Sequence, residues 1–235
     1  MNANEVMAKL EELGKERTKK IYMSNGAHEP LFGVATGAMK PMAKQIKINQ
    51  ELAEQLYETG NYDAMYFAGV IADPINMTRD DFNRWISKAY FYMISDYVVA
   101  VTLAESPHAQ SIADEWIASS EELKQSAGWS CYCWLLGNQK DENFSSEKLK
   151  AMLHLVKENI YQEKPRVQIS MSYFVTAVSV SYKPLHSYAL EIAKQISPIE
   201  VKRENKKDSV LNPYESIMKE VEKDRIGFKR KYVRC

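Results

Sequence analysis

The sequence has few cysteines, glycines and prolines. Its 235 residues include three cysteines, Cys131, Cys133 and Cys235. An odd count with C-x-C spacing does not indicate a disulfide framework, and no second Cys/His pair stands at ligand spacing. We therefore expect free, mostly buried thiols and no metal site. The nine glycines and eight prolines stand mostly at the ends of expected helices.

Long apolar runs and an excess of one charge are also missing. No stretch of about 18 apolar residues exists, so no transmembrane helix is expected. The polar start, MNANEVMAKLEELGKERTKK, lacks the apolar centre of a signal peptide, which makes the cytoplasm the expected location. A net charge of +0 argues against a uniformly basic nucleic-acid binder but leaves room for a basic patch.

Apolar residues recur at helical spacing along almost the whole chain. Thr78 with Asp81 resembles a capping box, and Ser145, Pro165 and Pro213 are acceptable helix starts. We read AVSVSY (177–182) as helix and VKRENKKDSVLNP (201–213) as the best candidate for a mobile loop. The expected helices cover about 3–22, 37–47, 49–58, 61–72, 78–105, 108–119, 120–136, 146–162, 165–181, 184–196 and 213–224.

Many helices joined by short turns predict an all-α fold, either a bundle or an α-solenoid. Strict repeats are not visible, but loose helical pairs of about 40 residues fit a HEAT-type array. No P-loop, G-x-G-x-x-G or G-x-S-x-G motif appears, and the four histidines show no ligand spacing. The motifs therefore give no reason to expect a bound cofactor or metal.

The most unusual stretch is AYFYMISDYVVAV (89–101), which places one carboxylate, Asp96, among aromatic and aliphatic residues. An unpaired buried carboxylate is costly, so Asp96 needs a local partner, an open position, or a function. A continuous 78–105 helix at about 100° per residue puts Asp96 on the flank of the core face, on the side of Trp85, Tyr92 and Val99. We therefore expect it beside aromatic surface rather than in the core.

Two interpretations of Asp96 stay open. In the structural one it is a boundary residue, bonded to a tyrosine hydroxyl or a lysine of a neighbouring helix. In the functional one it is a carboxylate beside aromatic surfaces that pack against a sugar or a base.

Lysines recur along the expected helix 37–47. Lys40, Lys44 and Lys47 stand at i, i+4 and i+7, which predicts one cationic ridge able to contact phosphates along a duplex. Alternatively, these lysines form an ordinary solvent-exposed face of the helix that contacts no phosphate.

Four segments, in this order and spacing, resemble the HEAT-like-repeat DNA alkylation repair family of AlkD-type alkylpurine DNA glycosylases. They are EPLFGVATGAMKPMAKQIK, LAEQLYETGNYDAMYFAGVIADP, YFYMISDYV and DEWIASSEELKQSAGW. The resemblance covers the chain from about residue 5 to its end. It implies one domain over 1–235, a right-handed α-solenoid of HEAT-like antiparallel helix pairs whose concave face is a basic DNA-binding groove.

Members of that family cut a cationic alkylated purine from its sugar. A carboxylate stabilises the oxocarbenium-like sugar, two tryptophans contact the DNA backbone, and an arginine assists. The resemblance places the carboxylate at Asp96, one tryptophan at Tyr92, the arginine at Ser126 and the second tryptophan near Tyr173. This chain thus keeps the carboxylate, has tyrosine for both tryptophans, and loses the arginine's fixed cation.

Three functions follow as alternatives. The first is a glycosylase for N3- or N7-alkylated purines with Asp96 as its catalytic residue. The second is a non-catalytic, structure-specific DNA-binding protein on the same scaffold, with Tyr92, Ser126, Tyr173, Lys40, Lys44 and Lys47 at the DNA. The third is a protein-interaction solenoid. We expect a monomer that binds duplex, damaged or branched DNA without a membrane or a small-molecule cofactor.

Overall fold

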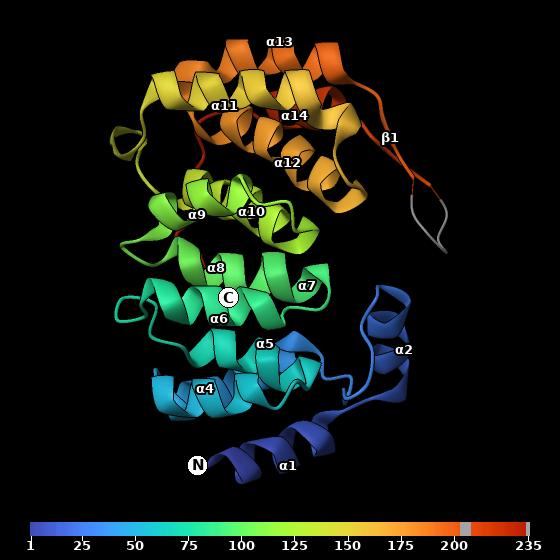
Figure 1. The fold of residues 1–235 in the computed structure, drawn as a ribbon, viewed down its shortest axis with the longest axis vertical. Coiled ribbons are helices and arrows are strands. Elements are labelled where there is room, and N and C mark those ends of the chain that lie inside the picture. The colour runs from blue at the N-terminus through green and yellow to red at the C-terminus, as the bar shows by residue number, and fades with distance from the viewer. Residues whose placement is uncertain (203–207, 234–235) are drawn as a thin grey trace. The chain divides into compact units, whose positions relative to one another are not determined.

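The computed structural model describes residues 1–202 and 208–233, and almost all of its regular elements are helices (Figure 1). The predicted all-α architecture of consecutive helices is therefore confirmed. The chain divides into two compact units, unit 1 (Met1–Ala109) and unit 2 (Gln110–Val233). The single domain over 1–235, the handedness and the concave face stay predictions.

Unit 1 is a series of short helices packed around α5. Helix α5 packs against α4, α3 and η2, and α1 contacts both α4 and α5. The elements are α1 (Ala3–Leu13), α2 (Glu16–Ser24), η1 (Thr36–Met39), α3 (Lys40–Ile46), α4 (Gln50–Glu58), α5 (Tyr62–Ile71), α6 (Arg79–Lys88), α7 (Tyr92–Ile94), the π-helical turn η2 (Ser95–Val99) and α8 (Ala100–Ala104).

Unit 2 is organised around α12, which packs against α10, α13 and α14. A small antiparallel sheet pairs Ile199 with Leu211. The elements are α9 (Ala109–Ile117), α10 (Glu122–Asn138), η3 (Asp141–Asn143), α11 (Ser146–Asn159), η4 (Ile160–Gln162), α12 (Pro165–Ser181), η5 (Lys183–Leu185), α13 (His186–Ile196), β1 (Ile199–Val201), β2 (Ser209–Leu211) and α14 (Pro213–Glu222).

Local sequence sets where many helices begin. The Thr78 hydroxyl accepts from the Asp81 amide while Asp81 accepts from the Thr78 amide, which confirms the predicted capping box of α6. Ser145 caps α11, and Pro165 stands in the first turn of α12. Asn212 caps α14, with Pro213 in its first turn. The capping side chains accept hydrogen bonds from amide groups that the helices leave unpaired, and each proline occupies a first-turn position where no amide donor is needed.

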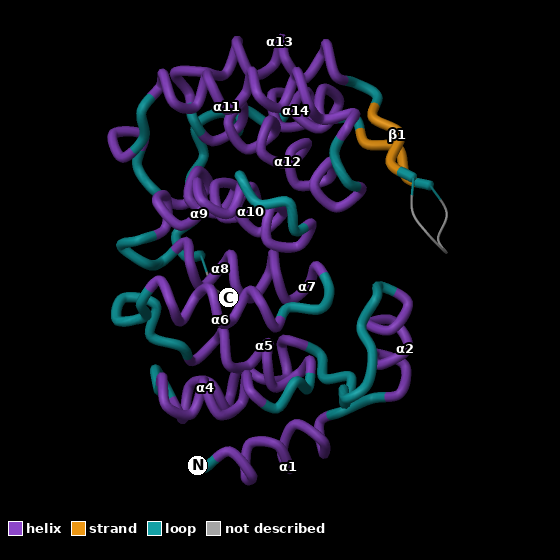
Figure 2. The backbone as a smooth tube through the Cα atoms, viewed as in Figure 1, coloured by secondary structure: helices purple, strands orange, loops and turns teal. Residues whose placement is uncertain are grey.

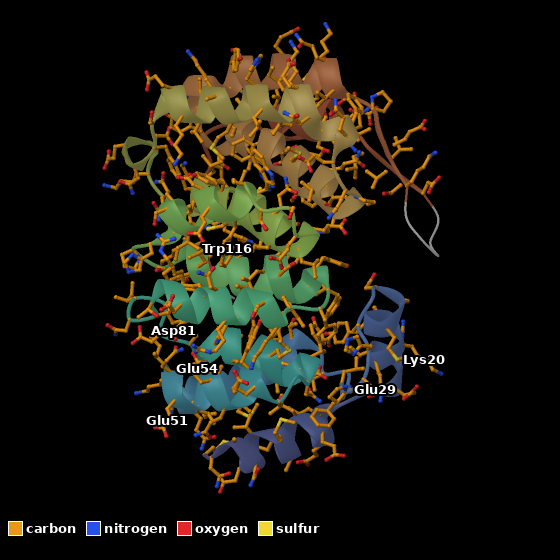
Figure 3. All side chains as sticks on the ribbon, viewed as in Figure 1. Lys20, Glu29, Glu51, Glu54, Asp81 and Trp116 are labelled. Atoms are coloured by element: carbon orange, nitrogen blue, oxygen red, sulfur yellow. The ribbon has the colours of Figure 1, made fainter. Side chains whose placement is uncertain are left out.

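The core of unit 1 contains a stacked pair that joins α4 to α6. The rings of Tyr57 and Trp85 are parallel with centroids 4.1 Å apart, and the Tyr57 hydroxyl donates to the Trp85 carbonyl. At the edge of this contact Arg84 pairs with Glu54 and Asp81, and the Trp85 indole N–H donates to Glu54. Figure 3 labels Glu54 and Asp81 among the side chains of unit 1. Helices α4 and α6 are thus joined by aromatic stacking and by ion pairs.

Two glycines allow helices to approach closely. A Cβ on Gly69 of α5 would lie 2.7 Å from Cγ1 of Val98 in η2. A Cβ on Gly128 of α10 would lie 2.8 Å from the carbonyl of Ala113 in α9. Both positions therefore need a residue without a side chain.

Two expected helices are broken. The expected helix 3–22 ends at Leu13 because the chain turns at Gly14, whose Cβ would meet the Phe32 carbonyl at 2.5 Å, and the Lys15 amide bonds the Gly33 carbonyl. The expected helix 78–105 ends at Lys88, and Ala89–Phe91 leave helical geometry before α7 begins. In both places a tertiary contact or a turn overrides helix propensity.

The two strands are an addition to the expected helices. Ile199 and Val201 are buried with Glu200 exposed between them, a strand pattern only three residues long. Part of the expected loop 201–213 is therefore strand β2, and 203–207 lie outside the described residues. Figure 2 shows the strands at the edge of the unit 2 helices. Within the described residues, no helix is both long and apolar enough to cross a membrane.

Candidate nucleic-acid interface

Asp63 fixes the loop that precedes α3. Its Oδ2 accepts hydrogen bonds from the amides of Phe32 and Gly33 at 2.6 and 2.9 Å, and its Oδ1 accepts one from Val34 at 2.8 Å. Asp63 is 0% exposed, and it lies in the first turn of α5, where a negative charge favours the helix dipole. Three amides and a helix N-terminus thus stabilise the buried carboxylate.

Further contacts hold the same loop. The Tyr22 hydroxyl donates to the Val34 carbonyl at 2.8 Å, and Lys19 pairs with Glu29 at 2.5 Å. Gly33 has a φ of 81°, and a Cβ there would lie 2.5 Å from the Lys19 amide. Only glycine satisfies both the backbone conformation and the close approach.

A pocket lies between α3 and α5, directly after this loop. Its volume is about 620 Å³. Tyr66 and Val70 stand three and seven residues after Asp63, so the α5 face that holds the loop also forms one wall of the pocket. The lining residues are Thr36, Met39, Lys40, Pro41, Ala43, Lys44, Tyr66 and Val70.

Lys40 and Lys44 line the pocket and are both exposed. They stand at i and i+4 of α3, as the predicted cationic ridge requires. Lys47 lies beyond the end of α3, with a φ of 62°, so helical spacing does not align its side chain with the other two. The part of the ridge that helix geometry supports is the Lys40–Lys44 pair.

An aromatic cluster lies beside the pocket in unit 1. Tyr62 contacts Tyr22, Tyr66 and Phe91, with ring centroids 4.9 to 6.5 Å apart. Phe91 also stacks on Tyr90, and His28 stacks on the Tyr90 ring with centroids 3.8 Å apart. His28 is exposed and Tyr90 is half-buried, so the cluster reaches the surface at this pair.

The tyrosine hydroxyls of this cluster stay protonated. Burial, reinforced by the negative charge of Asp63, raises the pKa of Tyr90 to about 12. Burial raises the pKa of Tyr22 to about 12 as well, with smaller contributions from Asp63 and Tyr66. Burial also raises the pKa of Tyr62. These side chains are therefore neutral groups at neutral pH, not general bases.

Asp96 is buried, with 1% of its surface exposed, and the Ser95 hydroxyl donates to its Oδ1 at 2.7 Å. The expected exposed flank position is therefore wrong. The wheel assumed one helix, but the chain leaves helical geometry at 89–91, and the π-helical turn holds more residues per turn than an α-helix. Trp85 and Val99, expected beside Asp96 on the flank, are 0% exposed.

Tyr92 is half-buried at the start of α7, and its ring contacts those of Phe91 and Tyr97 edge to face. Tyr97, which follows Asp96, is 37% exposed. The local chain therefore presents tyrosine rings toward solvent while the carboxylate between them points inward.

Ser126 and Tyr173 belong to unit 2. Ser126 lies in α10 and is 0% exposed, so this position offers neither a cation nor an open surface. Tyr173 lies on α12, the helix that packs on α10, and is 46% exposed. Of these two, only Tyr173 has a side chain that a ligand can reach.

Three features of unit 1 were not predicted from the sequence: the Asp63 contacts, the His28–Tyr90 stack and the pocket. The signals were the glycine-containing loop SNGAHEPLFGVATG and the aromatic density of 89–97, but neither shows which carboxylate meets which amide. Cys131 is buried and Cys133 half-buried, and neither forms a disulfide within the described residues. No group of three or more metal-ligating side chains gathers within the described residues.

Two relatives, Uncharacterized protein Lin0241 of Listeria innocua and Uncharacterized protein Lmo0209 of Listeria monocytogenes, are each 26% identical over 197 residues. Each match covers 82% of this chain and 85% of the relative.

A solved structure matches the whole chain, covering 100% of both chains at 66% identity with a TM-score of 0.97. It is described as "A new family of proteins related to the HEAT-like repeat DNA glycosylases with affinity for branched DNA structures". The helices described above are therefore those of a HEAT-like repeat fold. A sequence profile of the family described as DNA alkylation repair enzyme matches residues 6–207. The chain belongs to the DNA alkylation repair enzyme family.

Proposed function

We propose that this protein binds branched DNA without cutting it. The observation that carries the proposal is the 66% identity, over the full length, to a protein described as having affinity for branched DNA structures. At that identity the surface that contacts DNA is expected to be largely shared. Lys40, Lys44 and Tyr173 are exposed side chains of the kinds that contact phosphates and bases.

The environment of Asp96 supports a non-catalytic role. A carboxylate that stabilises an oxocarbenium-like sugar must come close to that sugar. Asp96 is 1% exposed and accepts a hydrogen bond from its neighbour Ser95. The position that the resemblance assigns to an arginine holds the buried Ser126, which supplies no cation. Both features work against base excision.

A second candidate function, excision of N3- or N7-alkylated purines, is favoured by one observation. The chain belongs to a repair family and keeps a carboxylate four residues after an aromatic side chain, Tyr92. This candidate function needs a conformational change in unit 1 that exposes Asp96. The same samples test both functions.

The test is a binding panel of linear duplex, mismatched duplex, three-way and four-way junctions, measured by gel shift and by fluorescence anisotropy at several salt concentrations. We expect tighter binding to junctions than to the duplex, with affinity that falls steeply with salt. A variant with Lys40→Glu and Lys44→Glu should bind more weakly, while Lys9→Glu with Lys20→Glu changes the net charge equally on another part of unit 1. Equal affinity for all four DNAs would overturn the branched-DNA preference, and a protein partner with no DNA affinity would favour an interaction solenoid.

Base release from methylated DNA tests the catalytic question. We expect no release above background by the unaltered protein or by Asp96→Asn. Release by the unaltered protein that disappears in Asp96→Asn would establish excision and overturn the non-catalytic proposal.

A further inference from the structure

The geometry of the pocket between α3 and α5 points to a ligand: one unpaired nucleotide of a DNA strand. Its base would pack against Tyr66 and its phosphate would meet Lys40 and Lys44. This inference rests on the DNA binding proposed above and names the part of a branched DNA that unit 1 takes. It concerns a site separate from Asp96.

The pocket has the size and the walls of a small-molecule site. Its volume of about 620 Å³ lies within the range of about 300–1,000 Å³ typical of ligand pockets. The apolar residues Met39, Pro41, Ala43 and Val70 line it, together with the aromatic residue Tyr66. A planar, largely apolar group such as a base fits these walls, because every base has a face that packs on aromatic and apolar side chains.

The charges in the pocket select an anion. Lys40 and Lys44 both line it, one helical turn apart, so their ammonium groups can meet one phosphate or two successive ones. Within the described residues neither lysine forms an ion pair. The positive charge is therefore available to a ligand, whereas Lys19, Lys88 and Arg84 in the same unit are each paired with a carboxylate.

A paired base fits this site poorly. The edges and faces of a base within a duplex are occupied by its partner and its stacked neighbours, and extruding it costs the free energy of that pairing and stacking. An unpaired nucleotide at a branch point avoids most of that cost. A purely electrostatic contact to duplex phosphates would use the lysines but leave Tyr66 and the apolar wall without a role. The combination therefore favours an unpaired nucleotide.

The pocket is held open by contacts already described. Its α3 side follows directly from the loop that Asp63 binds through the amides of Phe32, Gly33 and Val34. Its α5 side carries Asp63 itself, three residues before Tyr66. One helix thus holds both walls, so little reorganisation is needed when a ligand enters.

The experiment uses the full-length protein and three DNAs that share the same arms. The first is a three-way junction with a short unpaired segment at the branch, and the second is the same junction with abasic residues in that segment. The third is the fully paired junction. The abasic DNA keeps the phosphates and removes only the bases, so the affinity difference between the first two DNAs measures base binding.

Two variants test the pocket; the first has a matched control, and the second has a control that removes one charge outside the pocket. Ala43→Phe fills the pocket and leaves both lysines, and Gln45→Phe adds the same ring at an exposed position of α3 that does not line the pocket. Lys40→Gln with Lys44→Gln removes the two cations, while Lys47→Gln removes a nearby charge outside the pocket. Circular dichroism and thermal melting establish that each variant is folded.

We expect the abasic junction to bind about 5- to 150-fold more weakly than the unpaired junction, the range expected for stacking one base. Ala43→Phe should abolish this difference, and Gln45→Phe should retain it. The double lysine variant should weaken binding to both DNAs and reduce the salt dependence by more than Lys47→Gln does.

The outcomes separate this inference from the proposed function. If junctions bind tightly but the base makes no difference, or if Ala43→Phe and Gln45→Phe behave alike, the pocket assignment is wrong and the branched-DNA proposal stands. If Ala43→Phe does not fold, the lysine variants decide, because an equal effect of Lys47→Gln also rejects the assignment. If the unaltered protein binds no junction, both proposals fail. Equal binding of a free deoxynucleoside monophosphate and the unpaired junction would reassign the pocket to a soluble nucleotide.

Discussion

The Ser95 hydroxyl donates a 2.7 Å hydrogen bond to Oδ1 of Asp96, its neighbour in the π-helical turn. Both residues are buried, so this bond belongs to the interior of unit 1. A buried, hydrogen-bonded carboxylate affects the free energy of unfolding, and this effect can be measured independently of any activity.

Ser95→Ala should lower the free energy of unfolding by about 1–3 kcal/mol, because it removes a hydrogen-bond donor from a buried acceptor. Urea unfolding followed by circular dichroism measures this. Ser87→Ala on α6 removes an exposed hydroxyl that bonds the Arg84 carbonyl and should change stability by less than about 0.5 kcal/mol. Equal effects of the two variants would contradict a buried role for Ser95.

Asp63→Asn should destabilise unit 1 by about 2–4 kcal/mol. The amide group can accept through one oxygen only, so at least one of the three loop amides loses its acceptor and meets an N–H₂ group instead. Urea unfolding gives the loss, and limited proteolysis should cut the 25–39 loop faster. Asp73→Asn, which alters a bond to Asn76, is the control and should have a small effect. Unchanged proteolysis in Asp63→Asn would count against the proposed role of this carboxylate.

Two glycine substitutions should act in opposite directions. Gly69→Ala places a Cβ 2.7 Å from Val98 and should cost about 1–3 kcal/mol, partly offset by better helix propensity. Gly137→Ala on α10 meets nothing within 4 Å and should raise stability by up to about 1 kcal/mol. Thermal melting of both variants checks the sign. A stabilising Gly69→Ala would show that α5 and η2 have room to separate.

Two tyrosines of the aromatic cluster differ in what their hydroxyls contact. The Tyr62 hydroxyl is buried and has no hydrogen-bond partner within the described residues, whereas the Tyr22 hydroxyl donates to Val34. Tyr62→Phe should be neutral or stabilising, and Tyr22→Phe should cost about 1 kcal/mol. Urea midpoints give both values, and a clear loss in Tyr62→Phe would reveal an unseen partner.

Stability should fall at alkaline pH through Tyr22 and Tyr90. Each has a pKa of about 12 in the folded protein against an ordinary value of 10.0. A raised pKa means that the folded state holds the proton more tightly, so this stabilisation is present below pH 10 and is lost as the pH rises from about 10 to about 12. Urea midpoints across this range should fall less steeply in a Tyr22→Phe, Tyr90→Phe variant. Near-ultraviolet phenolate absorbance of the folded protein should show both groups ionising near pH 12.

Much of the fold could be predicted because its signals are local. The Thr78–Asp81 capping box and the Pro165 start each depend on residues within one turn, and the structure contains both. The predicted helix is confirmed over 177–181 for the same reason, since this segment continues the periodic pattern of α12, while Tyr182 lies just beyond the helix end. Local chemistry was enough to find these elements.

The misses depend on contacts distant in sequence or on departures from regular helix geometry. The break after Leu13 follows from the packing of Gly14 against Phe32, and the burial of Asp96 follows from a non-helical step at 89–91 and a π-helical turn. No periodicity reveals either, because a wheel assumes a constant rotation per residue. The Asp63 site joins residues about thirty positions apart, which a single sequence does not connect. The roles of Tyr92, Ser126 and Tyr173 at DNA stay predictions.

The Asp63 carboxylate recognises the loop entirely through main-chain amides. Such recognition makes no demand on the side chain at position 32, where every residue type except proline supplies the same N–H. That side chain, and with it the surface beside the pocket, can therefore vary among relatives. Asp63 and Gly33 would still hold the loop before α3 in the same position. The arrangement separates the part of the loop that sets geometry from the part that is free to set ligand preference.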